Sequence, residues 1–317
     1  MSPNGGDLDP QVRAFIAEVE AAGAPPLEML TPADARALQA QFVPQLAGAP
    51  EAVARVDDRE IAGPGGRLPV RVYAPAGEAL GALVWYHGGG FTIGSLDTAD
   101  PACRALARRA NCVVVSVGYR LAPEHPFPAA VDDACAAARW VAENAADLGY
   151  PSGRLAVGGD SGGGTLAIAA TFAARDGAVP QPCFQLLVYP ATGRGDGTPS
   201  YARYGAGGYL LTASQMDWFW RNYLPREADA ADPRACPERA ESLRGLPPAF
   251  VLLATCDPLH DEGRAYAGRL ERDGVAVRVA EYGGMIHGFF TMPGVFDRAR
   301  VAYDDAAAAL RAALSAD

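Results

Sequence analysis

The chain has 317 residues, of which 50% are hydrophobic, and a formal net charge of −10 at pH 7. This length and composition favour one large globular domain, or one domain with an elaboration, over two equal domains. The acidic balance argues against nucleic acid or a membrane surface as a partner, because both need clustered basic side chains.

The types of basic residue exclude several kinds of catalytic and phosphate-binding site. All 27 of them are arginine. Without lysine the chain cannot hold a Walker A phosphate site, a Schiff base or a Ser-x-x-Lys nucleophile pair. The four histidines are dispersed without the spacing of metal ligands, and no G-x-G-x-x-G stretch occurs. We therefore expect neither a metal nor a cofactor.

The sequence also lacks the patterns of exported and membrane proteins. The N-terminal stretch MSPNGGDLDP has neither the basic nor the apolar region of a secretory signal. The longest apolar runs have strand length, far below the ~20 residues that cross a bilayer. The six cysteines are scattered without a C-x-x-C pair, which is typical of reduced, buried thiols. These features predict a cytoplasmic protein.

From about residue 54, short apolar runs alternate with longer Ala-rich segments. The alternation predicts a mostly parallel sheet with helices on both faces. Long helices are expected over 128–148 and 297–315, the first beginning at Pro128 and stopping before Gly149. We expect eight strands, over residues 54–61, 68–74, 82–87, 111–118, 154–159, 183–189, 249–255 and 275–281.

Two regions interrupt the alternation. Residues 1–50 contain two predicted helices, 10–22 and 32–42, before the first strand. Residues 193–240 form a Gly-, Arg- and Asp-rich insertion between two strands, and within it the segment 215–224 concentrates aromatic side chains in one helix. This helix is either a lid over a site or a helix with a core-facing aromatic stripe.

A candidate nucleophile lies at Ser161. A strand ending in RLAVG leads into GGDSGGG (158–164) and then into an Ala-rich helix. In the order strand, G-x-S-x-G, helix, the motif is typical of a nucleophile elbow, where the serine takes strained dihedrals. Gly159 and Gly163 occupy the positions where a Cβ would clash. We expect Asp160 to brace the turn by local hydrogen bonds.

Chain order indicates the base and the acid. A serine hydroxyl needs a base to take its proton, and in α/β-hydrolases the acid and then the histidine follow the serine. His287 follows the last predicted strand, with His260 as its competitor. Asp257 directly follows the strand AFVLLATC, with Asp261 and Glu262 as rivals at the start of the next helix.

Three glycines, Gly88 to Gly90, follow His87 in the stretch WYHGGGF at the end of a predicted strand. Such a run marks a backbone that closely approaches another group or takes dihedrals barred to other residues. We expect the N–H groups of Gly89, Gly90 and Gly162 to stabilise an oxyanion. His87 would hold the loop by hydrogen bonds, and Gly88 would permit its turn.

Five motifs together carry a resemblance to a known family. In chain order they are HGGGF (87–91), YRLAPEHPFPAAVDD (119–133), GDSGGG (159–164), DPLHDEG (257–263) and GMIHGF (284–289). The chain resembles the hormone-sensitive-lipase-like bacterial carboxylesterases from about residue 60 to its C-terminus. The resemblance implies an α/β-hydrolase fold with an eight-stranded, mostly parallel sheet and a helical cap. Residues 51–192 and 241–317 would form the catalytic domain, and 1–50 and 193–240 the cap.

The resemblance also implies an activity. It makes Ser161 the nucleophile, Asp257 the orienting acid and His287 the base of a serine carboxylesterase. Such an enzyme would hydrolyse short- to medium-chain acyl esters, which are small molecules, through an acyl-enzyme intermediate. Family members often dimerise, so a homodimer is also expected. The residues expected to line the substrate pocket are Phe91, Tyr189, Tyr209 and Trp218.

Two positions depart from the family pattern. Gly162 stands where alanine often follows the nucleophile, and His260 stands where arginine often follows DPL. Three other functions stay open: a ligand-binding protein of the same fold, such as the plant gibberellin receptors, a long-chain lipase, or an amidase. Because those receptors lack the catalytic histidine, the retention of Ser161, Asp257 and His287 favours an enzyme.

Overall fold

The computed structural model describes residues 7–195 and 197–316, so residues 1–6 and 196 of the predicted cap and residue 317 lie outside the described residues. Eight strands form one sheet in the order β1-β2-β4-β3-β5-β6-β7-β8. Only the β1–β2 and β2–β4 pairs are antiparallel, and the other five pairs are parallel. The strands are β1 Arg55–Gly63, β2 Gly66–Ala74, β3 Ala82–Tyr86, β4 Val113–Val117, β5 Leu155–Asp160, β6 Phe184–Val188, β7 Ala249–Cys256 and β8 Val277–Ile286.

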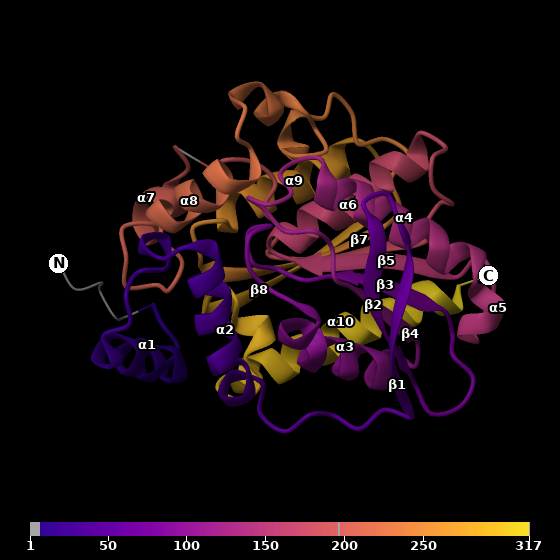
Figure 1. Cartoon of the computed structure of the whole chain (residues 1–317), viewed down its shortest axis with the longest axis horizontal. Helices are drawn as coiled ribbons and strands as arrows, with labels where there is room; N and C mark the ends of the chain where they lie inside the picture. The colour runs from indigo at the N-terminus through magenta and orange to yellow at the C-terminus, as the bar shows by residue number, and fades with distance from the viewer. Residues whose placement is uncertain (1–6, 196, 317) are drawn as a thin grey trace.

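Helices cover both faces of this sheet, as Figure 1 shows, with α4, α6 and α9 on one side and α3 and α10 on the other. These elements confirm the predicted mostly parallel eight-stranded sheet flanked by helices. The helices are α1 Pro10–Ala22, α2 Pro32–Ala47, α3 Leu96–Ala110, α4 Ala129–Glu143, α5 Ala145–Leu148, α6 Gly162–Arg175, α7 Pro199–Tyr204, α8 Ala213–Tyr223, α9 His260–Arg272 and α10 Asp297–Ser315.

The core lies in two layers, one on each face of the sheet. Successive side chains of a strand point to opposite faces, and β3 shows the consequence. Val84 and Tyr86 join the layer under α4 and α6, while Leu83 and Trp85 join the layer under α3 and α10. All of β3 is buried, which explains why the central strands appear in the sequence as continuous apolar runs.

Two helices differ from their predicted bounds. The predicted helix 128–148 is divided into α4 and α5 at Asn144, whose side chain donates to the Trp140 carbonyl at 2.8 Å and so competes with the helix backbone. Helix α2 continues to Ala47, past the predicted end at residue 42, with Pro44 inside it. A proline removes one backbone hydrogen-bond donor, and here the remaining backbone hydrogen bonds maintain the helix.

The last strand is longer than predicted and carries the chain to the site. The register between β7 and β8 shifts between Ala254 and Cys256, a bulge that lets β8 run on to Ile286. The next residue, His287, therefore leaves the sheet at the edge where the loops after β5 and β7 also begin. At the same end of the molecule lie α1, α2, α7 and α8, the helices of the two interrupting regions (Figure 1).

Ser161 is the single residue between β5 and α6. It has φ 55° and ψ −125°, a conformation that costs free energy for a residue with a Cβ. The turn packs against the end of β3. A Cβ on Gly163 would overlap the carbonyl oxygen of Tyr86, and one on Gly159 would lie 2.5 Å from the same oxygen. Both positions therefore require glycine.

We expect Gly163→Ala to lower the free energy of unfolding by about 3 kcal/mol, because the obstructing oxygen is backbone and cannot rotate away. Gly268→Ala is the matched control. Gly268 lies inside α9 with nothing within 4 Å of the position of its Cβ, so helix propensity predicts a gain of up to about 1 kcal/mol. Urea unfolding measures both variants, and equal stability of the two would contradict the packing account.

Candidate active site

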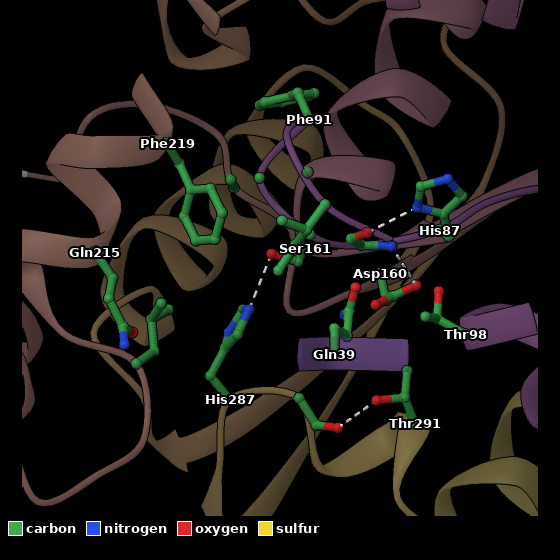
Figure 2. Close-up of a pocket in the computed structure, with 18 of the residues that line it drawn as sticks. Gln39, His87, Phe91, Thr98, Asp160, Ser161, Gln215, Phe219, His287 and Thr291 are labelled. Atoms are coloured by element: carbon green, nitrogen blue, oxygen red, sulfur yellow. Dashed lines mark hydrogen bonds between the residues drawn. The ribbon is translucent and has the colours of Figure 1, made fainter. Parts of the chain in front are cut away.

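Ser161, Asp257 and His287 come together at the carboxyl edge of the sheet. His287 Nε2 lies 2.9 Å from Ser161 Oγ (Figure 2), and His287 Nδ1 lies 2.7 Å from Asp257 Oδ2. The three residues follow β5, β7 and β8 respectively. Because parallel strands end at one edge, residues far apart in the chain meet there.

The Asp257 carboxylate fixes the orientation of the imidazole. Asp257 is completely buried, and its second oxygen accepts from the Leu259 N–H at 2.8 Å. An ionised carboxylate only accepts, so it holds the proton of His287 on Nδ1 and leaves Nε2 as an acceptor for the Ser161 hydroxyl. Tyr189 packs against the imidazole, with ring centroids 4.6 Å apart.

The rival residues take other partners. Asp261 accepts from the Ser200 N–H at 2.8 Å, and Glu262 accepts from the Thr192 N–H at 2.7 Å. His260 lies 3.0 Å from an Asp261 oxygen, with its other ring nitrogen toward a surface glutamate. The structure therefore brings Asp257 and His287 to Ser161, while it directs His260, Asp261 and Glu262 elsewhere.

The glycines after His87 have different tasks. Gly89 and Gly90 have φ of 114° and 54°, values that favour glycine. The Gly89 carbonyl accepts from the N–H groups of Thr92 and Ile93, which closes the turn. Gly88 does not have a positive φ, and its expected role in permitting the turn stays a prediction. A Cβ at Gly88 would overlap the Asp160 carboxylate, so this glycine makes room for Asp160.

His87 and Tyr119 hold the start of this loop. The Tyr119 hydroxyl donates to the His87 carbonyl at 2.8 Å, and the two rings stack with centroids 4.3 Å apart. His87 Nδ1 lies 2.8 Å from the Gly88 carbonyl, to which it can donate. Burial lowers the pKa of His87 to about 4, so the ring is neutral near pH 7 and serves as a hydrogen-bonding support.

Asp160 links the glycine loop to the serine turn. Its Oδ1 accepts from the Gly88 N–H at 3.0 Å, across the gap between the ends of β3 and β5. The residue is 6% exposed, and this burial raises the pKa of its carboxyl to about 6. This hydrogen bond positions the glycine loop. The Asp160 carboxyl group that accepts it is buried, and burial disfavours the charged form of that group.

A cavity of about 300 Å³ opens onto Ser161 and His287. Its wall includes the glycine loop, α2 and especially α8. Of the four residues expected to line the substrate pocket, Phe91 is in this wall and Tyr189, Tyr209 and Trp218 are not. The further lining side chains include Leu27, Gln39, Ile93, Thr98, Leu211, Gln215, Met216, Phe219, Trp220, Thr291 and Met292.

The packing of Trp218 and Tyr209 explains why they lie outside this wall. Successive helix residues point about 100° apart, so in α8 Phe219 and Trp220 reach the cavity while Trp218 does not. Tyr209 stacks edge-to-face on Tyr204 in the core. In the sequence, only the aromatic content of segment 215–224 indicated that this helix lines a site. The sequence could not predict which of its side chains point into the cavity.

Residues 7–195 and 197–316 hold neither a candidate membrane-spanning helix nor a cluster of metal ligands. No helix in this part of the chain is long and apolar enough to span a membrane. No group of three or more His, Cys, Asp or Glu among the same residues is placed to hold a metal ion. The expectation that the chain uses neither metal nor cofactor stays a prediction.

The raised pKa of Asp160 makes a prediction about stability. The folded protein binds this proton more tightly than the unfolded chain, so the contribution of Asp160 to the free energy of unfolding falls as the pH rises from about 4 to about 6. Asp160→Asn keeps an oxygen to accept from Gly88 but has no such proton. We expect the variant to gain about 2 kcal/mol relative to the unmodified protein between pH 4.5 and 7.

Urea unfolding at the two pH values measures this difference. The lowered pKa of His87 acts in the opposite direction, since its contribution is lost as the pH falls from about 6.5 to about 4. It is present in both proteins and cancels in the comparison. Parallel pH profiles of the two proteins would contradict the account of Asp160.

Comparison with known proteins shows the family to which the chain belongs. Residues 83–291 match the model of a family described as having the α/β-hydrolase fold. Carboxylic ester hydrolase LipN of Mycobacterium tuberculosis is 41% identical, covering 98% of this chain and 85% of its own. Ethyl acetate hydrolase of Pseudomonas putida is 40% identical, covering 92% of this chain and 95% of its own.

Solved structures give the same result. An α/β-hydrolase enzyme from the metagenome of Lake Arreo superposes with a TM-score of 0.93 at 43% identity, covering 98% of this chain and 100% of its own. A hyperthermophilic esterase of Pyrobaculum calidifontis superposes with a TM-score of 0.92 at 41% identity, with the same coverage. The chain therefore belongs to the hormone-sensitive-lipase-like carboxylesterases of the α/β-hydrolase superfamily.

Proposed function

We propose that this carboxylesterase hydrolyses small esters through an acyl-enzyme on Ser161, with His287 as the base and Asp257 as the orienting acid. The observation that carries the proposal is the continuous hydrogen-bonded series from Ser161 Oγ through both nitrogens of His287 to the buried Asp257. A weak nucleophile, its base and an orienting group in contact are the parts that acyl transfer requires.

The reaction would begin when Ser161 Oγ attacks the ester carbonyl carbon and its proton passes to His287 Nε2. The tetrahedral intermediate then collapses, and His287 gives the proton to the leaving alcohol. A water molecule gives a proton to the same nitrogen as it attacks the acyl-enzyme, and this proton returns to Ser161 Oγ when the acid leaves. Asp257 stabilises the imidazolium that forms in both steps.

The negative charge on the carbonyl oxygen would be received by the backbone N–H groups of Gly89, Gly90 and Gly162. Gly162 is the first residue of α6, so its N–H has no carbonyl within the helix to bind. Gly89 and Gly90 line the cavity beside Ser161. Each donor of this kind typically contributes ~10²- to 10³-fold in rate.

The cavity supports a preference for short to medium acyl chains. Its volume is about 300 Å³, and Phe219 sits over Gly90 so closely that a Cβ on that glycine would overlap the ring. We propose that residues 1–50 and 193–240 act as the cap, because α2 and α8 both contribute to this wall. A cytoplasmic location and a homodimer stay predictions from the sequence.

The competing functions are less well supported. A binding protein of this fold would not need the contact between Ser161 and His287, which is present at 2.9 Å. A long-chain lipase needs room for an extended acyl chain, and this cavity offers little. An amidase would use the same three residues, so only substrate tests separate it from an esterase.

Substitutions test the three roles. Ser161→Ala and His287→Ala should each lower kcat at least 10³-fold towards p-nitrophenyl butanoate, because they remove the nucleophile or its base. His260→Ala is the control and should keep most of the activity, since His260 pairs with Asp261 instead. Full activity of Ser161→Ala, or loss of activity in His260→Ala alone, would overturn the assignment.

The acyl-length preference is tested with p-nitrophenyl esters from acetate to palmitate, below their critical micelle concentrations. We expect kcat/KM to be highest at about four to six acyl carbons and to fall at least 10-fold by twelve, because longer chains exceed the cavity. Phe219→Ala should shift the maximum to longer chains. A maximum at palmitate, or activation at a lipid interface, would instead indicate a lipase.

A further inference from the structure

Two glutamines project into the cavity from the two regions that interrupt the sheet. Gln39 lies on α2 and Gln215 on α8, and both line the cavity that opens onto Ser161. Figure 2 shows them on opposite sides of the Ser161–His287 pair. They are among the few polar side chains in a wall that is otherwise largely aromatic and aliphatic.

In both glutamines the carbonyl oxygen already has a partner. Gln39 Oε1 accepts from the Gly94 N–H at 2.8 Å, where the glycine loop ends. Gln215 Oε1 accepts from the Thr212 N–H at 3.2 Å, in the capping box that begins α8. These bonds fix the orientation of each amide.

The amide nitrogens are left for another acceptor. None of the hydrogen bonds among the described residues uses Nε2 of Gln39 or of Gln215. An NH₂ group only donates, so each glutamine offers donors to whatever enters the cavity. An ester with unsubstituted alkyl chains would displace water from these donors and offer no acceptor in its place. The lost hydrogen bonds would lower the affinity for such an ester.

The charges around the cavity favour a substrate whose acceptor group is neutral. No arginine is among the described lining residues, and the titratable side chains there are His87, Asp160 and His287. A carboxylate-bearing substrate would therefore meet Asp160 without a cation to compensate it. A substrate cation would gain nothing from two amide donors.

We propose that this carboxylesterase prefers neutral esters that carry a second oxygen acceptor, such as a ketone, an ether or a second ester carbonyl, bound by Gln39 and Gln215. Since the two glutamines lie on opposite sides of Ser161 (Figure 2), one binds the acyl part and the other the alcohol part. The inference rests on the proposed function, because it assigns these sides relative to attack by Ser161.

Two matched substrate pairs test the proposal. On the acyl side, p-nitrophenyl 4-oxopentanoate is compared with p-nitrophenyl pentanoate, and on the alcohol side 2-methoxyethyl butanoate is compared with butyl butanoate. Each ratio of kcat/KM is divided by the ratio of the alkaline hydrolysis rates of the same esters, which removes their intrinsic reactivity. We expect the oxygen-bearing ester to be preferred about 5- to 10-fold in each pair, the effect of one hydrogen bond between neutral groups.

Variants connect the preference to the two side chains. Gln39→Met should abolish it in one pair and Gln215→Met in the other. Gln39→Glu and Gln215→Glu keep an oxygen to accept from Gly94 or Thr212 and replace the NH₂ donors by a second, acidic oxygen that cannot donate when ionised. They should lose the same preference even if a methionine variant folds poorly. Gln181→Met and Gln181→Glu, at an exposed position away from the cavity, should leave both ratios unchanged.

The outcomes distinguish failure of this inference from failure of the proposed function. A wild-type enzyme that hydrolyses pentanoate and butanoate esters but shows no preference in either pair would overturn the inference and leave the proposed function intact. So would unchanged ratios in the Gln39 and Gln215 variants. Absence of hydrolysis of all four esters would instead overturn the proposed function.

Discussion

The site depends on one close approach of backbone to backbone, where the first turn of α6 meets the end of β3. There is no room for a side chain between Gly163 and the Tyr86 carbonyl, so the turn after β5 and the loop after β3 are held in direct contact. This contact sets Ser161 in its strained conformation and brings the glycine loop beside it. A proposed nucleophile and a proposed oxyanion site are thereby fixed relative to each other before any substrate binds.

Buried polar groups complete the positioning, at a cost in stability. Asp160 joins the turn to the glycine loop through the Gly88 N–H, although burial disfavours its charge. Behind the serine, the Ala191 N–H donates to the Ser161 carbonyl at 3.2 Å, and Glu262 accepts from the next N–H in the chain, that of Thr192. Functional sites commonly concentrate such groups, because geometry there matters more than the stability of each interaction.

The sequence predicted the framework well because strong local signals determine it. Continuous apolar runs identified the central strands, and the G-x-S-x-G context identified the turn at Ser161. The sequence could not predict which aromatic residues of α8 face the cavity, because that depends on how the helix is rotated against the sheet, which a short aromatic run leaves open. Nor could it predict that Gly88 makes room for Asp160, since only coordinates reveal the carboxylate beside this glycine. The proposed roles of Gln39 and Gln215 were likewise hidden, because no local sequence pattern marks a glutamine whose carbonyl oxygen has a partner and whose nitrogen has none.

The central claim is that Ser161 forms a covalent intermediate. The direct measurement is intact-protein and peptide mass spectrometry after treatment with an alkyl p-nitrophenyl phosphonate, which traps an activated serine. We predict one adduct per chain, located on Ser161, with one equivalent of p-nitrophenolate released and activity lost in proportion. Inactivation with the adduct on another residue, or continued turnover after Ser161 is fully modified, would contradict the account.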